Sequence, residues 1–296
     1  MRRVMGALSI IGGAAALAAS AAPAPACGCG IAFDAKAASE RAYIGFSGGR
    51  EDLVVSLGLS GRSHAAVVLP VPSTPAVGLA PSGRDLFTYL RKSTAVKTVI
   101  VRHPGPSPVG GGGPPEGPRP LIIGTKTIGG YTITRLRGGT STTLLDWLRG
   151  HGYRLPSGAG RILDRYVADG WSFVAIRLAR RAKGLLAPLR LRFKTTAPVY
   201  PLRLDRLAST DIDLDLWTVA AHRMRSRDLT TDYAGPVASL APSVPAALTR
   251  YLRTGWVTHF EAKPLSEAAT GHDVLPVRAP HDTPYRRVVR KDVYTG

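Results

Sequence analysis

Alternating apolar and polar residues predict a β-hairpin in the first third of the chain. Residues 42–47 and 52–59 have the pattern of strands, and Gly48-Gly49 between them supplies the residues that a tight hairpin turn needs. Residues 65–69 form a third apolar strand, which ends at a proline-rich segment. Further strands are expected at residues 97–101, 121–137 with a turn at Gly129-Gly130, 171–178, 189–194, 199–204, 212–219 and 256–262.

Apolar residues spaced three and four positions apart predict helices between these strands. The first begins at Ser82, whose hydroxyl is expected to cap it, with Asp85 three residues on as in a capping box. Two more are expected at residues 140–149 and 161–169, each ending before a glycine, and a last one at 244–254, capped by Ser243 with Pro245 in its first turn. Their inward faces are expected to be Leu86, Phe87 and Leu90, then Leu144, Leu145 and Leu148, then Ile162, Leu163, Tyr166 and Val167. Runs of strands with helices between them favour an α+β fold of mixed, mostly antiparallel sheets with about four short helices.

One glycine- and proline-rich segment interrupts the pattern. Residues 104–120 contain 13 Gly or Pro among 17 positions and are expected to form a mobile, disordered loop. Because only about 70 residues separate this loop from the N-terminal segment, the interpretation is a single domain over residues 27–262; two subdomains are the alternative. The polar remainder, residues 263–296, is expected to be a loosely held tail.

Two strand patterns carry charge on alternate positions. Period two places each charged set on a single face of its strand. Pairing the basic set with the acidic one would contribute about 0.2–1 kcal/mol per cross-strand pair, so these strands are predicted to be neighbours or nearly so. The basic set is Arg190, Arg192 and Lys194, and the acidic set is Asp211, Asp213 and Asp215.

The composition is strongly basic. The chain has 39 Lys plus Arg against 20 Asp plus Glu, a formal charge of +19, and 31 of the cations are Arg. A hydrophobic content of 44% excludes wholesale disorder, a collagen and a coiled-coil rod. The cations form no long run and aromatic residues are only 7%, so nucleic acid is not the expected partner. An Arg-biased, actinobacterial-like composition with a charged surface is one interpretation; attraction to an anionic phospholipid surface or a phosphate-bearing envelope polymer is the other.

The N-terminus has the pattern of an export signal. Arg2 and Arg3 precede an apolar stretch at residues 5–19, and Ala-Pro-Ala occurs twice, ending at Ala24 and at Ala26. We expect a signal peptide over residues 1–26 and an exported protein, either extracellular or attached to the outer face of the cytoplasmic membrane. No other segment approaches about 18 apolar residues, so no transmembrane span is expected after cleavage; an uncleaved N-terminal anchor is the alternative.

The two cysteines adjoin the predicted cleavage site. Cleavage before Cys27 with acylation of its thiol would make the chain a lipoprotein. A local disulfide between Cys27 and Cys29 is a second interpretation, although so short a loop would be strained. Two cysteines with no second pair and no nearby histidine do not make a metal or redox site, so neither a metal nor a cofactor is expected.

No complete catalytic motif is present. Gly-x-Ser-x-Gly, His-Glu-x-x-His and Cys-x-x-Cys do not occur. The weak candidates for a general base are His222 and His259, near strand ends, with Asp215 and Glu261 as their carboxylates.

Two further carboxylate patterns have ordinary explanations. The three alternating aspartates beginning at Asp211 resemble the start of a calcium loop, but Leu216 and His222 stand where Gly and Glu are required. Arg50-Glu51-Asp52 follows a Gly-Gly turn, where charged side chains are expected to face water.

A family resemblance runs through most of the chain, from about Cys27 to Phe260. The motifs that carry it are Glu40-Arg41-Ala42-Tyr43-Ile44, Gly49-Arg50-Glu51-Asp52-Leu53, Val68-Leu69-Pro70-Val71-Pro72, Gly130-Tyr131, Leu145-Asp146-Trp147-Leu148, Gly152-Tyr153, Tyr166, Gly170-Trp171-Ser172-Phe173-Val174-Ala175 and Pro198-Val199-Tyr200-Pro201-Leu202. In this order they resemble the exported bacterial proteins grouped as domain of unknown function 2330. The resemblance implies export and a single domain, and it implies no particular activity. Many members carry further cysteines, which this sequence lacks, so a family disulfide framework does not carry over.

Two classes of function therefore remain. The first is a non-catalytic extracytoplasmic binding or structural module at the cell envelope. The second is a secreted hydrolase with an unrecognised active site.

Overall fold

The fold is built on the predicted β-hairpin. In the computed structural model, β2 (Gly30–Ser47) and β3 (Arg50–Val71) pair antiparallel over most of their length. Gly48 and Gly49 turn the chain with φ of 57° and 67°, the left-handed values that a two-residue hairpin turn requires. The hairpin is confirmed, but the expected third strand at residues 65–69 is the continuation of β3, because two register shifts let the long strands bend without ending.

The structure describes residues 26–27, 30–102, 125–136, 141–150, 157–178, 187–207, 212–266 and 269–293. The expected loop at residues 104–120, residues 1–25 of the expected signal peptide, Ala24, Cys29 and Asp211 lie outside these ranges. Ala26 and Cys27 form β1, which pairs with the start of β2.

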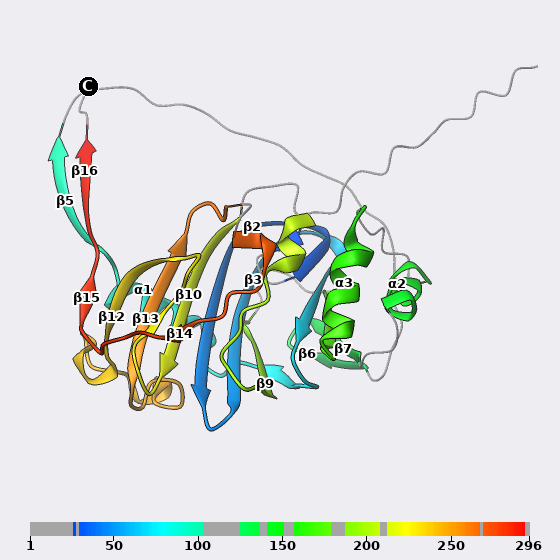
Figure 1. Ribbon diagram of the computed structural model, residues 1–296, viewed down its shortest axis with the longest axis horizontal. Helices are drawn as coiled ribbons and strands as arrows, with labels where there is room; N and C mark the ends of the chain where they lie inside the picture. Colours follow the sequence, from blue (N-terminus) through cyan, green and yellow to red (C-terminus); the bar gives the residue numbers. More distant parts are fainter. Residues whose placement is uncertain are drawn as a thin grey trace, which may run out of the picture.

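A large sheet spreads to both sides of the hairpin (Figure 1). Its strand order is β15-β12-β13-β10-β2-β3-β8-β7-β6, while β9 pairs with β3 on one side and β4 on the other. The further strands of this sheet are β4 (Ala76–Leu79), β6 (Thr125–Ile128), β7 (Tyr131–Leu136), β8 (Ser172–Leu178), β9 (Leu189–Lys194), β10 (Asp213–Ala220), β12 (Thr230–Pro236), β13 (Trp256–Ala262) and β15 (Tyr285–Arg286). Most neighbours are antiparallel and β10 runs parallel to β2, which confirms the mixed, mostly antiparallel α+β class.

Two short strand pairs of the described residues lie outside the large sheet. β11 (Met224–Arg225) pairs antiparallel with β14 (Val277–Arg278). β5 (Lys97–Arg102) pairs in parallel with β16 (Val288–Val293), and this ribbon projects from the end of the sheet that holds β12 and β15 (Figure 1).

The described residues contain three α-helices, where about four were predicted. They are α1 (Gly83–Ser93), α2 (Ser141–Gly150) and α3 (Ala159–Ala168). Their predicted apolar positions are buried or partly buried. α2 and α3 lie at the β8-β7-β6 end of the sheet (Figure 1). No helix in the described part of the chain is long and apolar enough to cross a membrane.

The expected Ser82 cap is wrong. Ser82 has φ of 53° and makes no side-chain hydrogen bond to the helix. α1 therefore begins at Gly83, one residue later. The backbone of Gly83 packs closely on Ala80, because a Cβ added at Gly83 would lie 2.8 Å from the Cβ of Ala80. This close packing, and not a hydroxyl cap, marks the start of the helix.

The predicted helix at residues 244–254 is wrong as well. One 3-10 turn forms, η3 (Ala246–Leu248), and the chain then continues as turns. The Tyr251 carbonyl accepts a hydrogen bond from the Tyr43 hydroxyl at 2.7 Å, and the Tyr251 hydroxyl donates to the Pro81 carbonyl at 2.9 Å. Tertiary bonds thus replace the helical ladder.

The predicted strand at residues 199–204 is reduced to a single bridge between Tyr200 and Val274, followed by the 3-10 helix η1 (Arg203–Leu207). The Asp273 carboxylate accepts the N–H groups of Leu202 and Arg203 at 3.0 and 3.3 Å, so a side chain takes the place of a strand partner.

The expected loose tail beyond residue 263 is also part of the fold. Residues 269–293 contain η4 (Ala269–Gly271), β14, β15 and β16, and β15 extends the large sheet. The polar composition misled the prediction because several of these polar groups, Asp273 among them, are buried and partnered.

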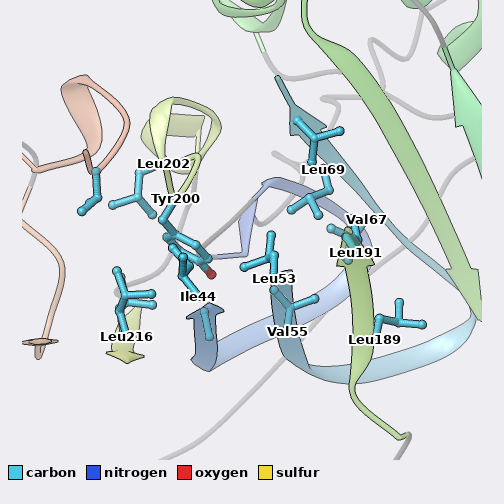
Figure 2. Packing of buried hydrophobic residues seen from close by; sticks show 14 of the residues in the cluster. Ile44, Leu53, Val55, Val67, Leu69, Leu189, Leu191, Tyr200, Leu202 and Leu216 are labelled. Carbon is cyan, nitrogen blue, oxygen red and sulfur yellow. The ribbon is translucent and has the colours of Figure 1, made fainter. Parts of the chain in front are cut away.

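Three buried clusters hold the layers together. The first lies on one face of the hairpin and joins it to β9, β10 and the segment just before η1; Figure 2 shows Ile44, Leu53, Leu191, Tyr200 and Leu216 converging there. The second lies on the opposite face, under α1 and the 3-10 turns η2 (Val237–Ser239) and η3. The third packs α2 and α3 against β8. Alternation along the strands separates the first two clusters, because successive side chains point to opposite faces.

Candidate functional site

The structure brings three of the four weak acid-base candidates together on β10 and β13. Asp215 lies directly opposite Glu261 in the antiparallel ladder, and Trp217 lies opposite His259. The Nε2 atom of His259 is 3.1 Å from the Asp215 carboxylate. Because antiparallel neighbours alternate in step, all of these side chains share one face of the sheet.

Two cations complete this group and neutralise it. Lys263 Nζ lies 2.6 Å from Glu261 and 3.4 Å from Asp215. Arg287 joins Glu261 to the buried Asp232, with both N···O distances at 2.7 Å. Burial alone would raise the pKa of Asp215, but the hydrogen bond and charge of His259 and the charge of Lys263 outweigh it, so the pKa lies below its usual range.

His259 is held as a packed residue. Its ring stacks on Trp217 with centroids 4.4 Å apart and an angle of 8° between the planes. The Trp217 indole N–H donates to the Thr94 hydroxyl at 2.9 Å, which anchors the stack to the end of α1. These contacts make the group a structural link between β10, β13 and the C-terminal segment.

His222 does not join this group. Its Nδ1 atom pairs with Asp282 at 2.7 Å in an exposed position. Asp282 also accepts the Arg223 backbone N–H at 2.8 Å, so the pair fastens the C-terminal segment to the chain after β10. The hollow found among the described residues lies elsewhere, beside η2 and η3, and is lined mainly by Val237, Leu240 and other apolar side chains.

The described residues contain no group of three or more His, Cys, Asp or Glu side chains arranged to hold a metal ion. The acid-base cluster offers one histidine, His259, whose Nε2 is occupied by Asp215 and whose Nδ1 is buried without a hydrogen-bond partner among the described residues.

Glu51 contradicts the expectation that the charged residues after the turn face water. Its side chain is 1% exposed, because period two places it in phase with Leu53 and Val55 on the core face. Its Oε2 atom accepts the Val199 N–H at 2.8 Å, and its Oε1 has no hydrogen-bond partner among the described residues. Burial raises the pKa of Glu51 well above its usual range, and the bond from Val199 lowers it by less.

Replacing Glu51 by Gln should stabilise the protein at neutral pH. The pKa of Glu51 is higher in the folded protein than in the unfolded chain, where it is about 4.3. The stabilising contribution of the protonated carboxyl is therefore complete below about pH 4.3 and is lost as the pH rises through the folded-state pKa. Gln stays neutral and can still accept from Val199. In urea titrations we expect Glu51→Gln to match the parent near pH 4 and to exceed its free energy of unfolding at pH 7 by on the order of 1 kcal/mol or more.

The matched control is Glu261→Gln, which removes a carboxylate with two cationic partners and should lower stability at pH 7. A Glu51→Gln variant less stable than the parent at pH 7 would show that the carboxylate is needed in its charged form.

Asp52 and Arg190 form the salt bridge of the opposite face. Arg190 Nε donates to Asp52 at 2.7 Å, and its Nη2 contacts the other carboxylate oxygen. The guanidinium also lies 5.3 Å from the centre of the Tyr251 ring. The predicted partnership of the basic strand with Asp213 and Asp215 is therefore wrong, since β2 and β3 separate β9 from β10 and a nearer carboxylate lies on β3.

A cationic surface results on β3 and β9. Arg50 lies directly opposite Lys194 in the ladder, and Asp52 lies opposite Arg192. Arg50, Arg192 and Lys194 are exposed, and none of them has a side-chain partner among the residues that the structure describes. We call Arg50, Asp52, Arg190, Arg192 and Lys194 the β3–β9 cationic face. The alternation on residues 189–194 signalled it, whereas Arg50 could be added only once the register was known.

The fold and its surface define a sheet-rich α+β protein that displays unpaired cations and pairs several of its carboxylates with Arg or Lys. The model of one family, described as an uncharacterized protein conserved in bacteria (DUF2330), matches residues 23–249. The chain therefore belongs to this family, as the resemblance of its motifs indicated. No curated protein and no solved structure matches the chain.

Proposed function

We propose that this protein is an exported, non-catalytic module that binds an anionic polymer at the bacterial cell envelope. The N-terminal pattern of Arg2, Arg3 and the apolar residues 5–19 supports export. The distribution of charge on the folded chain supports the choice of ligand.

The observation that carries the proposal is that acidic and basic side chains differ in how often they form ion pairs. The more buried aspartates pair with arginines: Asp52 with Arg190, Asp232 with Arg287, and Asp273 with Arg203. Exposed cations without such a partner occur in the described part of the chain; examples are Arg91 and Lys92 on α1, and Arg192 and Lys194 on β9. Without Arg2 and Arg3 of the expected signal peptide, 37 Lys plus Arg remain against 20 Asp plus Glu, and this excess of +17 attracts an anionic ligand to the surface.

A secreted hydrolase has less support. Its candidate base, His259, is stacked on Trp217 and bound to Asp215, and the acids beside it are bound to Lys263 and Arg287. A general base must reach a proton of the substrate, and this geometry commits the side chains to one another.

Cell fractionation with mass spectrometry of the N-terminus tests the proposal. We expect the chain outside the cytoplasm, lacking residues 1–26, and released from the envelope by high salt because screened charges no longer attract. The mass of Cys27 distinguishes a free from an acylated N-terminus. Recovery of the intact chain in the cytoplasm, or retention that salt does not affect, would contradict the proposal.

A further inference from the structure

We propose that the β3–β9 cationic face is the binding site for one stretch of a linear, phosphate-bearing polymer. This inference rests on the proposed function and names its site and the chemistry of its ligand.

The ladder places like charges side by side. Lys194 lies directly opposite Arg50, and Arg192 lies one step along the same face. Like charges directly opposite each other are destabilising in an isolated sheet, so their juxtaposition is favourable only when water or an anion lies against them. Asp52 offers little relief, because Arg190 holds both of its oxygens.

The spacing of the charges suits a repeating anion. Residues on one face of a strand repeat at about 6.8 Å, twice the rise per residue, so Arg190, Arg192 and Lys194 form a row along β9. Arg50 lies beside the end of this row at the usual strand separation of about 4.8 Å. Arginine pairs with phosphate through two parallel hydrogen bonds, which suits the two unpaired arginines, Arg50 and Arg192, to phosphate groups.

Small residues on the edge strand β4 leave the row accessible from that side. In the ladder, Arg192 is flanked by Ala76 and Arg190 by Gly78. A Cβ added at Gly78 would meet nothing within 4 Å, so space is open there. A flexible chain could therefore reach the exposed Arg192 and Lys194 across β4 without displacing a side chain of that strand.

The surroundings favour a water-soluble polymer over a membrane. Binding to a lipid surface normally adds apolar side chains that enter the bilayer beside the cations. The large apolar side chains that are exposed in the described part of the chain are Val99, Leu275, Val277, Tyr285 and Val288. They lie on β5 and the C-terminal segment, and the sheet order places β15 and β9 at opposite sides of the hairpin.

Binding of the full chain to fluorescently labelled inorganic polyphosphate tests the inference. The site variant carries Arg50→Gln, Arg192→Gln and Lys194→Gln. The control variant carries Lys126→Gln, Arg161→Gln and Arg165→Gln, which remove the same charge from exposed positions on β6 and α3. At about 50 mM salt we expect the site variant to bind at least tenfold more weakly and to lose about two to three units from the slope of log affinity against log salt. The control should stay within about twofold of the parent.

A charge-retaining variant, Arg50→Lys with Arg192→Lys, guards against misfolding as the explanation. It should keep the parent's salt slope and bind more tightly than the site variant, but more weakly than the parent because lysine cannot form the paired hydrogen bonds of arginine. If the parent binds polyphosphate and the site and control variants lose affinity equally, the site is wrong while the proposed function stands. If the parent does not bind polyphosphate but binds single-stranded DNA or vesicles of phosphatidylglycerol and phosphatidylcholine, both the site and the proposed function are wrong.

Discussion

Replacing Asp273 by Ala is expected to destabilise the protein by about 3–5 kcal/mol. The carboxylate is 3% exposed and accepts the Tyr166 hydroxyl as well as two backbone N–H groups. It also pairs with Arg203 Nε at 3.0 Å. Removing it leaves a half-buried guanidinium and three donors without their acceptor, and each unsatisfied buried group costs about 1–3 kcal/mol. Urea unfolding followed by circular dichroism measures the loss.

Asp169→Ala is the matched control for this prediction. Asp169 is the second carboxylate on Arg203, also at 3.0 Å, but its side chain is 48% exposed. Solvent screens such a pair, and we expect a loss below about 1 kcal/mol. If the two variants lose similar amounts of unfolding free energy, Asp273 does not stabilise the packing of the C-terminal segment against α3 and η1.

Replacing Trp217 by Ala is expected to cost about 3–5 kcal/mol, the usual range for removing a large buried aromatic side chain. Trp217 is fully buried, donates to Thr94, stacks on His259 and contacts Phe87 at a centroid distance of 6.0 Å. Removing the indole would eliminate its contacts with α1 and with β13 together. Thermal and urea unfolding, with the near-ultraviolet circular dichroism of the aromatic side chains, measure the effect.

Trp217→Phe separates packing from hydrogen bonding at this position. Phe retains most of the buried area but cannot donate to Thr94, so we expect a smaller loss than for Ala. If the free energy of unfolding of Trp217→Ala lies within about 1 kcal/mol of that of the parent, the second buried cluster does not depend on this residue.

Local structure was readable from the sequence where short-range chemistry decides it. Gly48-Gly49 and Gly129-Gly130 adopt positive φ and turn hairpins as predicted. The helices at residues 140–149 and 161–169 form close to their expected bounds because their apolar faces are clear; Gly170 follows the second helix with φ of 73° as predicted, whereas the first includes Gly150, which was expected to lie beyond its end. Propensity and pattern point to the same structure at these places.

Long-range pairing was not readable. The alternating cations of residues 189–194 were correctly placed on one face, but nothing local indicates that Asp52, far away in the chain, supplies the carboxylate. The C-terminal segment was misjudged for the same reason, because the partners of Asp273 and Arg287 lie 26 to 107 residues away in sequence.

The candidate site was predictable in part. Asp215, His259 and Glu261 do meet, since two strands of alternating residues became antiparallel neighbours. The sequence did not indicate that Lys263 and Arg287 would pair with these carboxylates. These ion pairs indicate that the group stabilises the fold and is not an acid-base catalyst. Glu51 was missed, although its phase with Leu53 and Val55 already signalled burial.

These features fit a scaffold that displays charge. Paired carboxylates and three apolar clusters fix the sheet, and a sheet with fixed register holds Arg192, Lys194 and Arg50 at constant spacing. Preorganised cations bind a polymer at a lower entropic cost than flexible ones.

The most direct test of this account is the binding of the purified chain to bacterial cell envelopes from which detergent has removed the lipid. We expect the chain to sediment with these envelopes at about 50 mM salt and to be released by high salt or by added inorganic polyphosphate. Binding that disappears when the lipid is removed, or that persists unchanged in high salt, would contradict it.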